Sequence, residues 1–139
     1  MESLFYISEG QIGHEEASSS RIASLVQGSL VKNARLNLTG ALLFTGTHFV
    51  QILEGPNEEL DQLMRSIERD IRHTNVTVID RGPITTRQFP KWGLAYFGPS
   101  NFVSQRVLSV LNCSPGTERR RMAERLRYLI SELAGWRPK

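Results

Sequence analysis

Cysteine is almost absent from this sequence, since Cys113 is the only one in 139 residues. An internal disulfide is therefore excluded, and a reducing compartment such as the cytoplasm is the expected location. No apolar run approaches the roughly 20 residues that a membrane-spanning helix needs. The first ten residues, MESLFYISEG, lack the cationic region and the long apolar stretch of a signal peptide. We therefore expect no membrane partner.

Repeats and low-complexity linkers are also missing, and 40% of the residues are hydrophobic, which fits one compact domain.

Positive charge is in excess only near the C-terminus. Residues 117–139 contain seven Lys or Arg and three Asp or Glu. Such a segment is typical of the solvated face of a C-terminal helix. The alternative is a basic regulatory module that binds nucleic acid or an acidic partner. Its candidate residues are Arg119, Arg120, Arg121, Arg125 and Arg127.

The hydrophobic pattern predicts strands over residues 4–8, 38–44, 49–53, 76–80 and 92–97. Serines 18–20 are expected to cap a first helix that ends near Lys32 and Asn33. Asn57 is expected to cap a second helix. The apolar face of that helix comprises Leu60, Leu63, Met64, Ile67 and Ile71. Two more helices are predicted over 103–111 and 118–133, the latter with a stripe of Met122, Leu126, Leu129, Ile130 and Leu133.

The order β-α-β-β-α-β-β predicts an α+β fold with a ferredoxin-like sheet and two helices on one face. In that arrangement the first and third strands lie side by side at the centre of the sheet. The C-terminal helices would cover the other face or form a dimer surface. We therefore expect a domain over 1–98 and a helical extension over 99–139.

One glutamine interrupts the apolar strand HFVQILEG. Side chains alternate across a strand, and both sets of neighbours of Gln51 are apolar, so neither face offers it water. An unpaired buried amide costs roughly 1–3 kcal/mol. If the first and third strands are neighbours, the Tyr6 hydroxyl can lie within hydrogen-bond reach of Gln51.

That contact leaves Gln51 with unused donors. Asn33, at the end of the first predicted helix, is a second amide near the same face. Arg72 and His73, at the end of the second predicted helix, add cationic or donor groups. The two helices would thus flank a groove that holds a planar partner rich in acceptors.

Five blocks of this chain, taken together and in order, resemble the successive motifs of one family. They are LFYIS with Tyr6, KNARLNLTGALLF, HFVQILEGP, DIRHTNV and RQFPKWGL. Between residues 2 and 98 the chain is similar to BLUF domains, which sense blue light using flavin. The resemblance implies an oxidised flavin, FAD or alternatively FMN, bound non-covalently between the two helices. It also implies a photoreceptor and not an enzyme.

The resemblance implies a role for each site residue. Tyr6 would donate an electron and then a proton, and Gln51 would rearrange by rotation or tautomerisation. The state formed after illumination would have a new hydrogen bond to the flavin C4 carbonyl. Its absorption would be shifted slightly to the red relative to the dark state. The other matched positions are Asn33 at the pyrimidine edge of the flavin, Arg72 and His73 near that edge, Ser29 of the first helix, and Trp92 and Leu94 as relay residues.

Two positions depart from the family pattern. Leu94 stands where many members have a methionine that is one proposed relay from the glutamine. Lys32 stands in place of a common asparagine, and we expect it near the phosphates of the cofactor. Cys113 lies outside any NCRFLQ-type segment, so the resemblance does not extend to flavin sensors that form a cysteine adduct.

The expected output is a protein contact, because about forty residues follow residue 98 and leave no room for a fused cyclase or phosphodiesterase. A downstream signalling protein and a homo-oligomer are the expected partners, and nucleic acid is not. A small hydrolase of the acylphosphatase type is a further alternative, but no Gly-rich loop suited to phosphate is present.

Overall fold

A mixed five-stranded sheet organises the molecule. The computed structural model describes residues 1–10, 15–70, 73–98 and 100–135. The strands are β1 (Glu2–Gly10), β2 (Thr39–Phe44), β3 (His48–Gly55), β4 (His73–Pro83) and β5 (Trp92–Phe97), in the order β4-β1-β3-β2-β5. Neighbouring strands are antiparallel, except that β2 and β5 are parallel. The prediction that the first and third strands lie side by side at the centre is confirmed.

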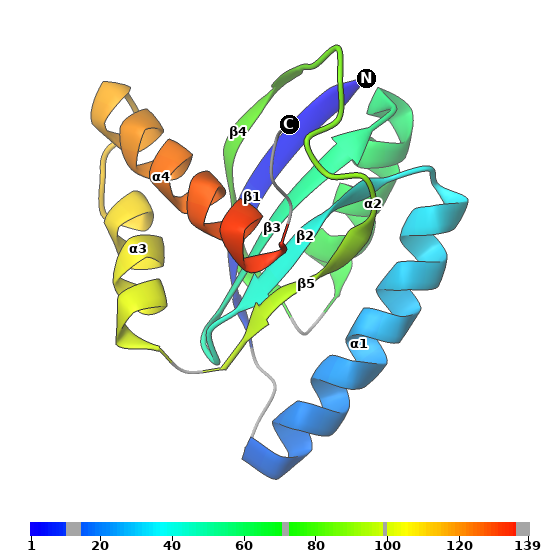
Figure 1. The fold of residues 1–139 in the computed structure, drawn as a ribbon, viewed down its shortest axis with the longest axis horizontal. Coiled ribbons are helices and arrows are strands. Elements are labelled where there is room, and N and C mark those ends of the chain that lie inside the picture. Colours follow the sequence, from blue (N-terminus) through cyan, green and yellow to red (C-terminus); the bar gives the residue numbers. More distant parts are fainter. Residues whose placement is uncertain (11–14, 71–72, 99, 136–139) are drawn as a thin grey trace.

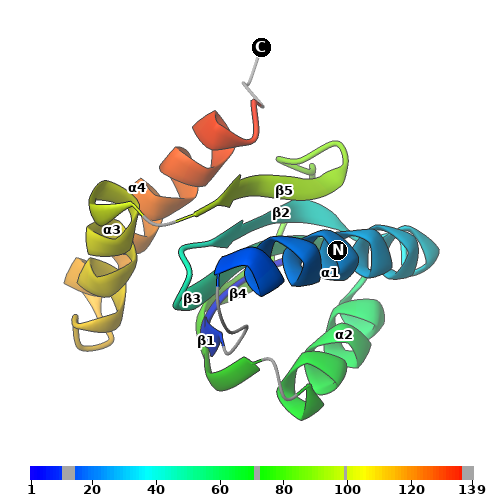
Figure 2. The same cartoon turned by 90° about the horizontal axis from the view of Figure 1, so that it is seen from below.

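Helices cover both faces of this sheet (Figures 1 and 2). One face carries α1 (Glu15–Arg35) and α2 (Asn57–Arg69), and the other carries α4 (Thr117–Leu133). The remaining helix, α3 (Asn101–Leu111), packs against α4. The predicted ferredoxin-like α+β fold is confirmed, and the C-terminal helices take the sheet's second face. No helix in the described ranges is long and apolar enough to cross a membrane.

Two hydrophobic cores result from the alternation of side chains along the central strands. On β3, Phe49 and Leu53 belong to the core beneath α1 and α2. Val50 and Ile52 belong to the core beneath α3 and α4, and all four side chains are fully buried. The central strand thus has no side that faces water, which is the environment predicted for Gln51.

The helix starts differ from those predicted. The first helix begins at Glu15, upstream of residues 18–20, and continues to Arg35. The second helix begins at Asn57 itself, so the prediction that Asn57 caps it is wrong. Pro56 is the N-cap residue, and its carbonyl accepts the first helical hydrogen bond from Leu60 N. A proline can take this place because its missing N–H has no partner in the helix.

The fourth strand is longer than the predicted 76–80, because both of its ends pair with β1. His73 pairs with Gly10 and Pro83 with Glu2. His73 is therefore the first residue of β4 and not, as predicted, the end of the second helix. Ile71, expected on the apolar face of α2, lies outside the described residues.

The apolar stripe on α4 is buried over most of its length. Leu126 and Ile130 are fully buried, and Met122 and Leu129 are half-buried. Leu133, in the last turn, is 37% exposed, so the stripe is least covered at its C-terminal end.

We predict that Gly40→Ala strongly destabilises the fold. Gly40 has a φ of +147°, and a Cβ there would lie 1.8 Å from the carbonyl oxygen of Ile52 on the neighbouring strand. Both effects disfavour any side chain, so the free energy of unfolding in urea should fall by more than about 2 kcal/mol. Gly82→Ala is the matched strand control, because nothing lies within 4 Å of a Cβ there. Equal losses in the two variants would contradict the prediction.

Candidate functional site

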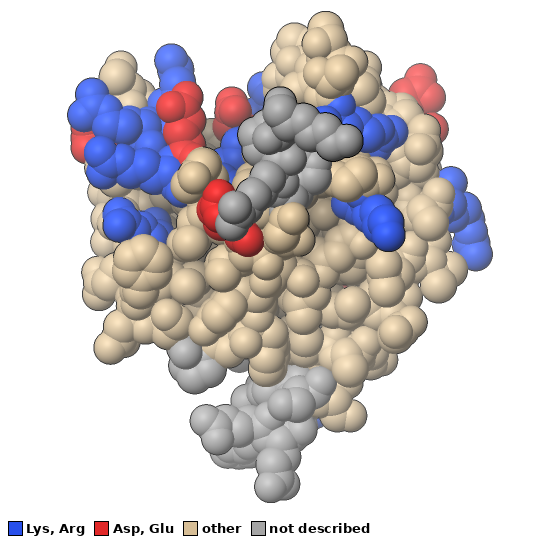
Figure 3. Space-filling view, in the orientation of Figure 1, with Lys and Arg blue, Asp and Glu red and all other residues tan. Residues whose placement is uncertain are grey.

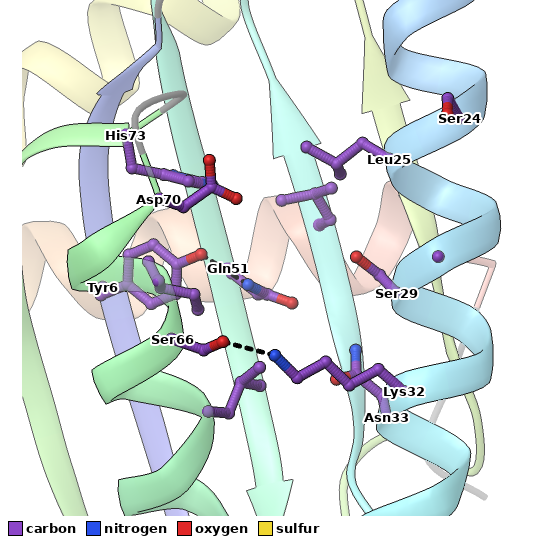
Figure 4. A pocket seen from close by; sticks show the side chains of 14 residues that line it. Tyr6, Ser24, Leu25, Ser29, Lys32, Asn33, Gln51, Ser66, Asp70 and His73 are labelled. Atoms are coloured by element: carbon purple, nitrogen blue, oxygen red, sulfur yellow. Dashed lines mark hydrogen bonds between the residues drawn. The ribbon is translucent and has the colours of Figure 1, made fainter.

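A cavity of about 280 Å³ opens between α1 and α2 above the centre of the sheet (Figure 4). Its volume is close to the lower limit of about 300 Å³ for small-molecule sites, which suits a flat ring system. The cavity is lined by Tyr6, Ser24, Leu25, Gly28, Ser29, Lys32, Asn33, Leu42, Gln51, Leu63, Ser66, Ile67, Asp70 and His73.

Three hydrogen-bonded side chains form a chain that begins at this cavity, where Tyr6 and Gln51 line it. Gln51 Nε2 donates to Tyr6 Oη at 2.6 Å, and Trp92 Nε1 donates to Gln51 Oε1 at 2.7 Å. Tyr6 and Gln51 meet because they are directly opposite each other in the β1–β3 register. All three side chains are buried. The predicted contact between Tyr6 and Gln51 is confirmed, and Trp92 supplies the second partner that the buried amide needs.

Asn33 contributes an unpaired acceptor to the same cavity. Its side chain is only 1% exposed, and its Oδ1 has no hydrogen-bond partner among the described residues. A buried acceptor without a donor costs about 1–3 kcal/mol. A ligand that presents an N–H group to Asn33 would remove this cost.

Burial raises the pKa of the Tyr6 phenol far above its ordinary value of 10. Desolvation is the main cause, and the negative charge of Asp70 adds to it, while the hydrogen bond from Gln51 opposes it. Tyr6 is therefore a neutral phenol throughout the physiological pH range. It can lose its proton there only together with another change of charge.

The other predicted residues enter the cavity from its sides. Lys32 Nζ donates to Ser66 Oγ at 2.5 Å and so joins α1 to α2 (Figure 4). Ser29 lines the α1 wall. His73 lies at the β4 end of the cavity, where its Nδ1 is 2.8 Å from Ser8 Oγ.

One predicted site residue lies away from this cavity, and another is not described by the structure. Arg72 lies outside the described residues. Leu94, on the edge strand β5, is 37% exposed and lines a different cavity beside the end of α4.

Conversely, Asp70 and Ser66 line the site although the sequence did not predict them. Their spacing of four residues near the end of a helix, with Asp70 opening the DIRHTNV block, is the signal that could have revealed them.

Comparison with known proteins identifies the class of this site. The model of the BLUF family, described as sensors of blue-light using FAD, matches residues 1–95. The chain therefore belongs to the BLUF family. The solved dark-state structure of BlrB, a BLUF protein, superposes on this chain with a TM-score of 0.72 and a sequence identity of 32%. The superposition covers 94% of this chain and 96% of the BlrB chain.

Two curated relatives carry the same kind of region inside longer chains. The photoactivated adenylate cyclase subunit beta of Euglena longa is 35% identical over 92 residues, which are 66% of this chain and 10% of the relative. The blue light- and temperature-regulated antirepressor BluF of Escherichia coli (strain K12) is 36% identical over 77 residues. These residues are 55% of this chain and 19% of the antirepressor. The chain thus spans about a tenth of the length of the cyclase relatives. Members of the family are linked to different effectors.

The residues present fit the family's cofactor, FAD. The ring of a flavin ends in an edge with one N–H between two carbonyls, and Asn33 offers both a free acceptor and amide donors. The predictions of a BLUF fold, a flavin cofactor and a light sensor are confirmed by the family match. The family match thus describes residues 1–95 as a sensor of blue light.

The raised pKa of Tyr6 predicts a loss of stability at high pH. Unfolded tyrosine ionises near pH 10, whereas folded Tyr6 stays neutral, so the contribution of Tyr6 is complete below pH 10 and decreases above it. Between pH 9 and 11 the free energy of unfolding of the wild type should fall by about 1.4 kcal/mol relative to Tyr6→Phe. Urea titrations of both proteins at the two pH values measure the difference. A constant difference would mean that the phenol is not buried.

Proposed function

We propose that this chain senses blue light through Tyr6 and Gln51, with 1–98 as the flavin-binding domain and 99–139 as the output segment. The observation that supports the proposal best is the buried hydrogen-bond chain that runs from Tyr6 through Gln51, which both line the cavity, to Trp92 on β5. When bound, FAD absorbs blue light and accepts an electron. The described residues supply the rest of the chemistry.

Tyr6 is the donor of the electron and of the proton. Its raised pKa keeps the proton on Oη until the electron leaves, and both return to Tyr6 at the end, so nothing is consumed. Tyr6 Oη accepts from Gln51 Nε2, which leaves the hydroxyl proton uncommitted to Gln51. The site can therefore release that proton without first breaking the contact between the two side chains.

Gln51 has two arrangements, which exchange the donor and the acceptor of its side chain, either by a rotation that swaps Oε1 and Nε2 or by a tautomerisation that moves a proton from Nε2 to Oε1. In the second arrangement an acceptor atom of Gln51 faces the Tyr6 hydroxyl, and a donor faces Trp92. Trp92 Nε1 is itself a donor, so the present 2.7 Å bond cannot persist. The rearrangement of one amide thus changes its bonds to β1 and to β5 together. Burial preserves the difference between the two states, because Gln51 is only 6% exposed and water has little access to replace a lost partner.

The side walls would hold and orient the cofactor. Asn33 would bind the pyrimidine edge of the flavin, with Ser29, His73 and Arg72 beside it. Lys32 would exchange its bond with Ser66 for a phosphate oxygen. FAD is the expected cofactor, and FMN is the alternative, as in a solved structure of BlrP1 with FMN.

The output would be a protein contact made by α3 and α4. Phe102 and Tyr128 are 58% and 68% exposed, and both line a groove of about 610 Å³ along these helices. Arg106, Arg121 and Arg125 line the groove together with Glu124 and Glu132, so a partner with an apolar centre and charged side chains of both signs around it would fit the groove. We propose a cytoplasmic signalling protein, or a second copy of this chain, as the partner.

Binding of nucleic acid through α4 is the weaker candidate. Figure 3 shows Lys and Arg gathered over the N-terminal part of α4, with acidic side chains among them. Arg119 Nε donates to the carbonyl of Val110, and the Arg127 guanidinium lies over the Phe5 ring. Arg121 is paired with Glu118. Three of the five candidate arginines therefore have partners within the protein.

Tyr6→Phe tests the electron donor. The variant should bind flavin and remain yellow, because the ring keeps its shape, but it should show no stable red shift after blue light. Absorption spectra before and after illumination measure this. Tyr128→Phe, on the exposed face of α4, is the matched control and should behave as the wild type. A normal shift in Tyr6→Phe would refute the role of Tyr6, and a wild type without any shift would refute the proposed function.

Lys32→Met tests the contact with phosphate. Loss of one charge-assisted hydrogen bond should weaken binding of FAD and FMN about tenfold and leave riboflavin, which has no phosphate, unchanged. Titration of the protein with each flavin, followed by fluorescence, gives the dissociation constants. Lys91→Met, at an exposed position away from the cavity, is the control. An equal loss for riboflavin would show that Lys32 acts on the groove and not on phosphate.

A further inference from the structure

The segment 84–91, between β4 and β5, connects the Gln51 site to the opposite face of the sheet. It ends one residue before Trp92. Arg87 fixes its middle to the sheet by donating to the Glu54 carbonyl at 2.8 Å and to Thr39 Oγ1 at 2.8 Å. Phe89, 2% exposed, packs in the core beneath α3 and α4. The segment is therefore a fixed part of the structure.

Glu54 binds the backbone of this segment from within the sheet. It lies three residues after Gln51 on β3, and its side chain is only 1% exposed. Its carboxylate accepts from Gln88 N at 2.9 Å and from Phe89 N at 2.7 Å. A buried carboxylate depends on such donors, because an unpaired one is very costly. The peptide groups at Gln88 are thus held against the strand that carries Gln51.

The side chain of Gln88 makes the connection to α4. Its Nε2 donates to Ser131 Oγ at 2.8 Å, and its Oε1 is 3.5 Å from Arg127 Nη1. Ser131 is 5% exposed and donates in turn to the carbonyl of Arg127 at 3.0 Å. The backbone of Gln88 is therefore bound to the sheet and its side chain to the last turns of α4.

A change at Gln51 reaches this connection over a short distance. Trp92, which must alter its bond when the Gln51 amide rearranges, is four residues from Gln88. The intervening chain includes Phe89, which is packed, and Lys91, whose carbonyl accepts from Gly40 N at 3.0 Å. Because only three residues separate Trp92 from Gln88, a displacement of Trp92 would act on Gln88 through a short stretch of chain.

We propose that Gln88 is a positioning residue that transmits the rearrangement at Gln51 to α4 through its hydrogen bond with Ser131. This inference rests on the proposed function, which leaves the route to the output helices open. It places the output change in the last turns of α4, beside the exposed Tyr128.

The test compares hydrogen exchange of α4 in the dark and under blue light, in the full chain loaded with FAD. Gln88→Leu keeps the volume of the side chain and removes its hydrogen bonds, and Ser131→Ala removes only the hydroxyl. In the wild type, light should change exchange in the last turns of α4. In both variants dark exchange there should rise about fivefold, as loss of one hydrogen bond implies, and the difference between light and dark should disappear. The double variant should resemble either single one.

Ser109→Ala is the matched control. Its hydroxyl also bonds a carbonyl of its own helix, Gln105 O at 2.7 Å, but it lies on the exposed side of α3. It should keep the difference between light and dark. The red shift should have its full size in every variant, because Gln88 does not touch the cavity.

Each outcome decides the proposal. A light response of α4 that survives in Gln88→Leu or Ser131→Ala overturns it, as does a wild type that shifts its spectrum without any change in α4. A lost red shift in these variants also overturns it, since Gln88 would then serve the photochemical step. If Gln88→Leu does not fold, Ser131→Ala decides alone. A wild type without a red shift refutes the proposed function instead.

Discussion

The burial of one carboxamide in a sheet that is covered on both faces constrains the whole arrangement. Gln51 has no access to water from its strand, so its partners must come from the side chains of other strands. Tyr6 on β1 and Trp92 on β5 supply them, one as acceptor and one as donor. An amide held in this way cannot exchange its oxygen and nitrogen without changing both contacts. The light response proposed for this protein depends on that asymmetry.

Much of this arrangement could be predicted from the sequence. The two-residue period of the strands indicated that Gln51 is buried, and the strand order placed Tyr6 opposite it. The hydrogen bond from Trp92 could not be predicted, because β5 is separated from β3 by β2. It depends on the reach of an indole across the intervening strand. Sequence spacing alone does not report such a contact.

The errors concern the ends of elements. His73 was misplaced because its pairing with Gly10 on β1 makes it the first residue of β4. Asn57 was misplaced by one position, because Pro56 is the N-cap residue of α2. The connection of Gln88 to Ser131 had no local signal at all. Its partners are 43 residues apart, and only the docking of α4 brings them together.

β5 is an edge strand of the sheet, which affects how a change at Trp92 can be transmitted. β5 is bound to β2 on one side only, and its ladder is irregular where Leu42 and Leu43 meet it. Tyr6, the proposed electron donor, thus lies on an inner strand that is paired on both sides, while Trp92, the proposed relay, lies on an edge strand. A displacement of β5 would therefore disturb the main-chain hydrogen bonds of one strand pair only, whereas a displacement of β1 would disturb those of two.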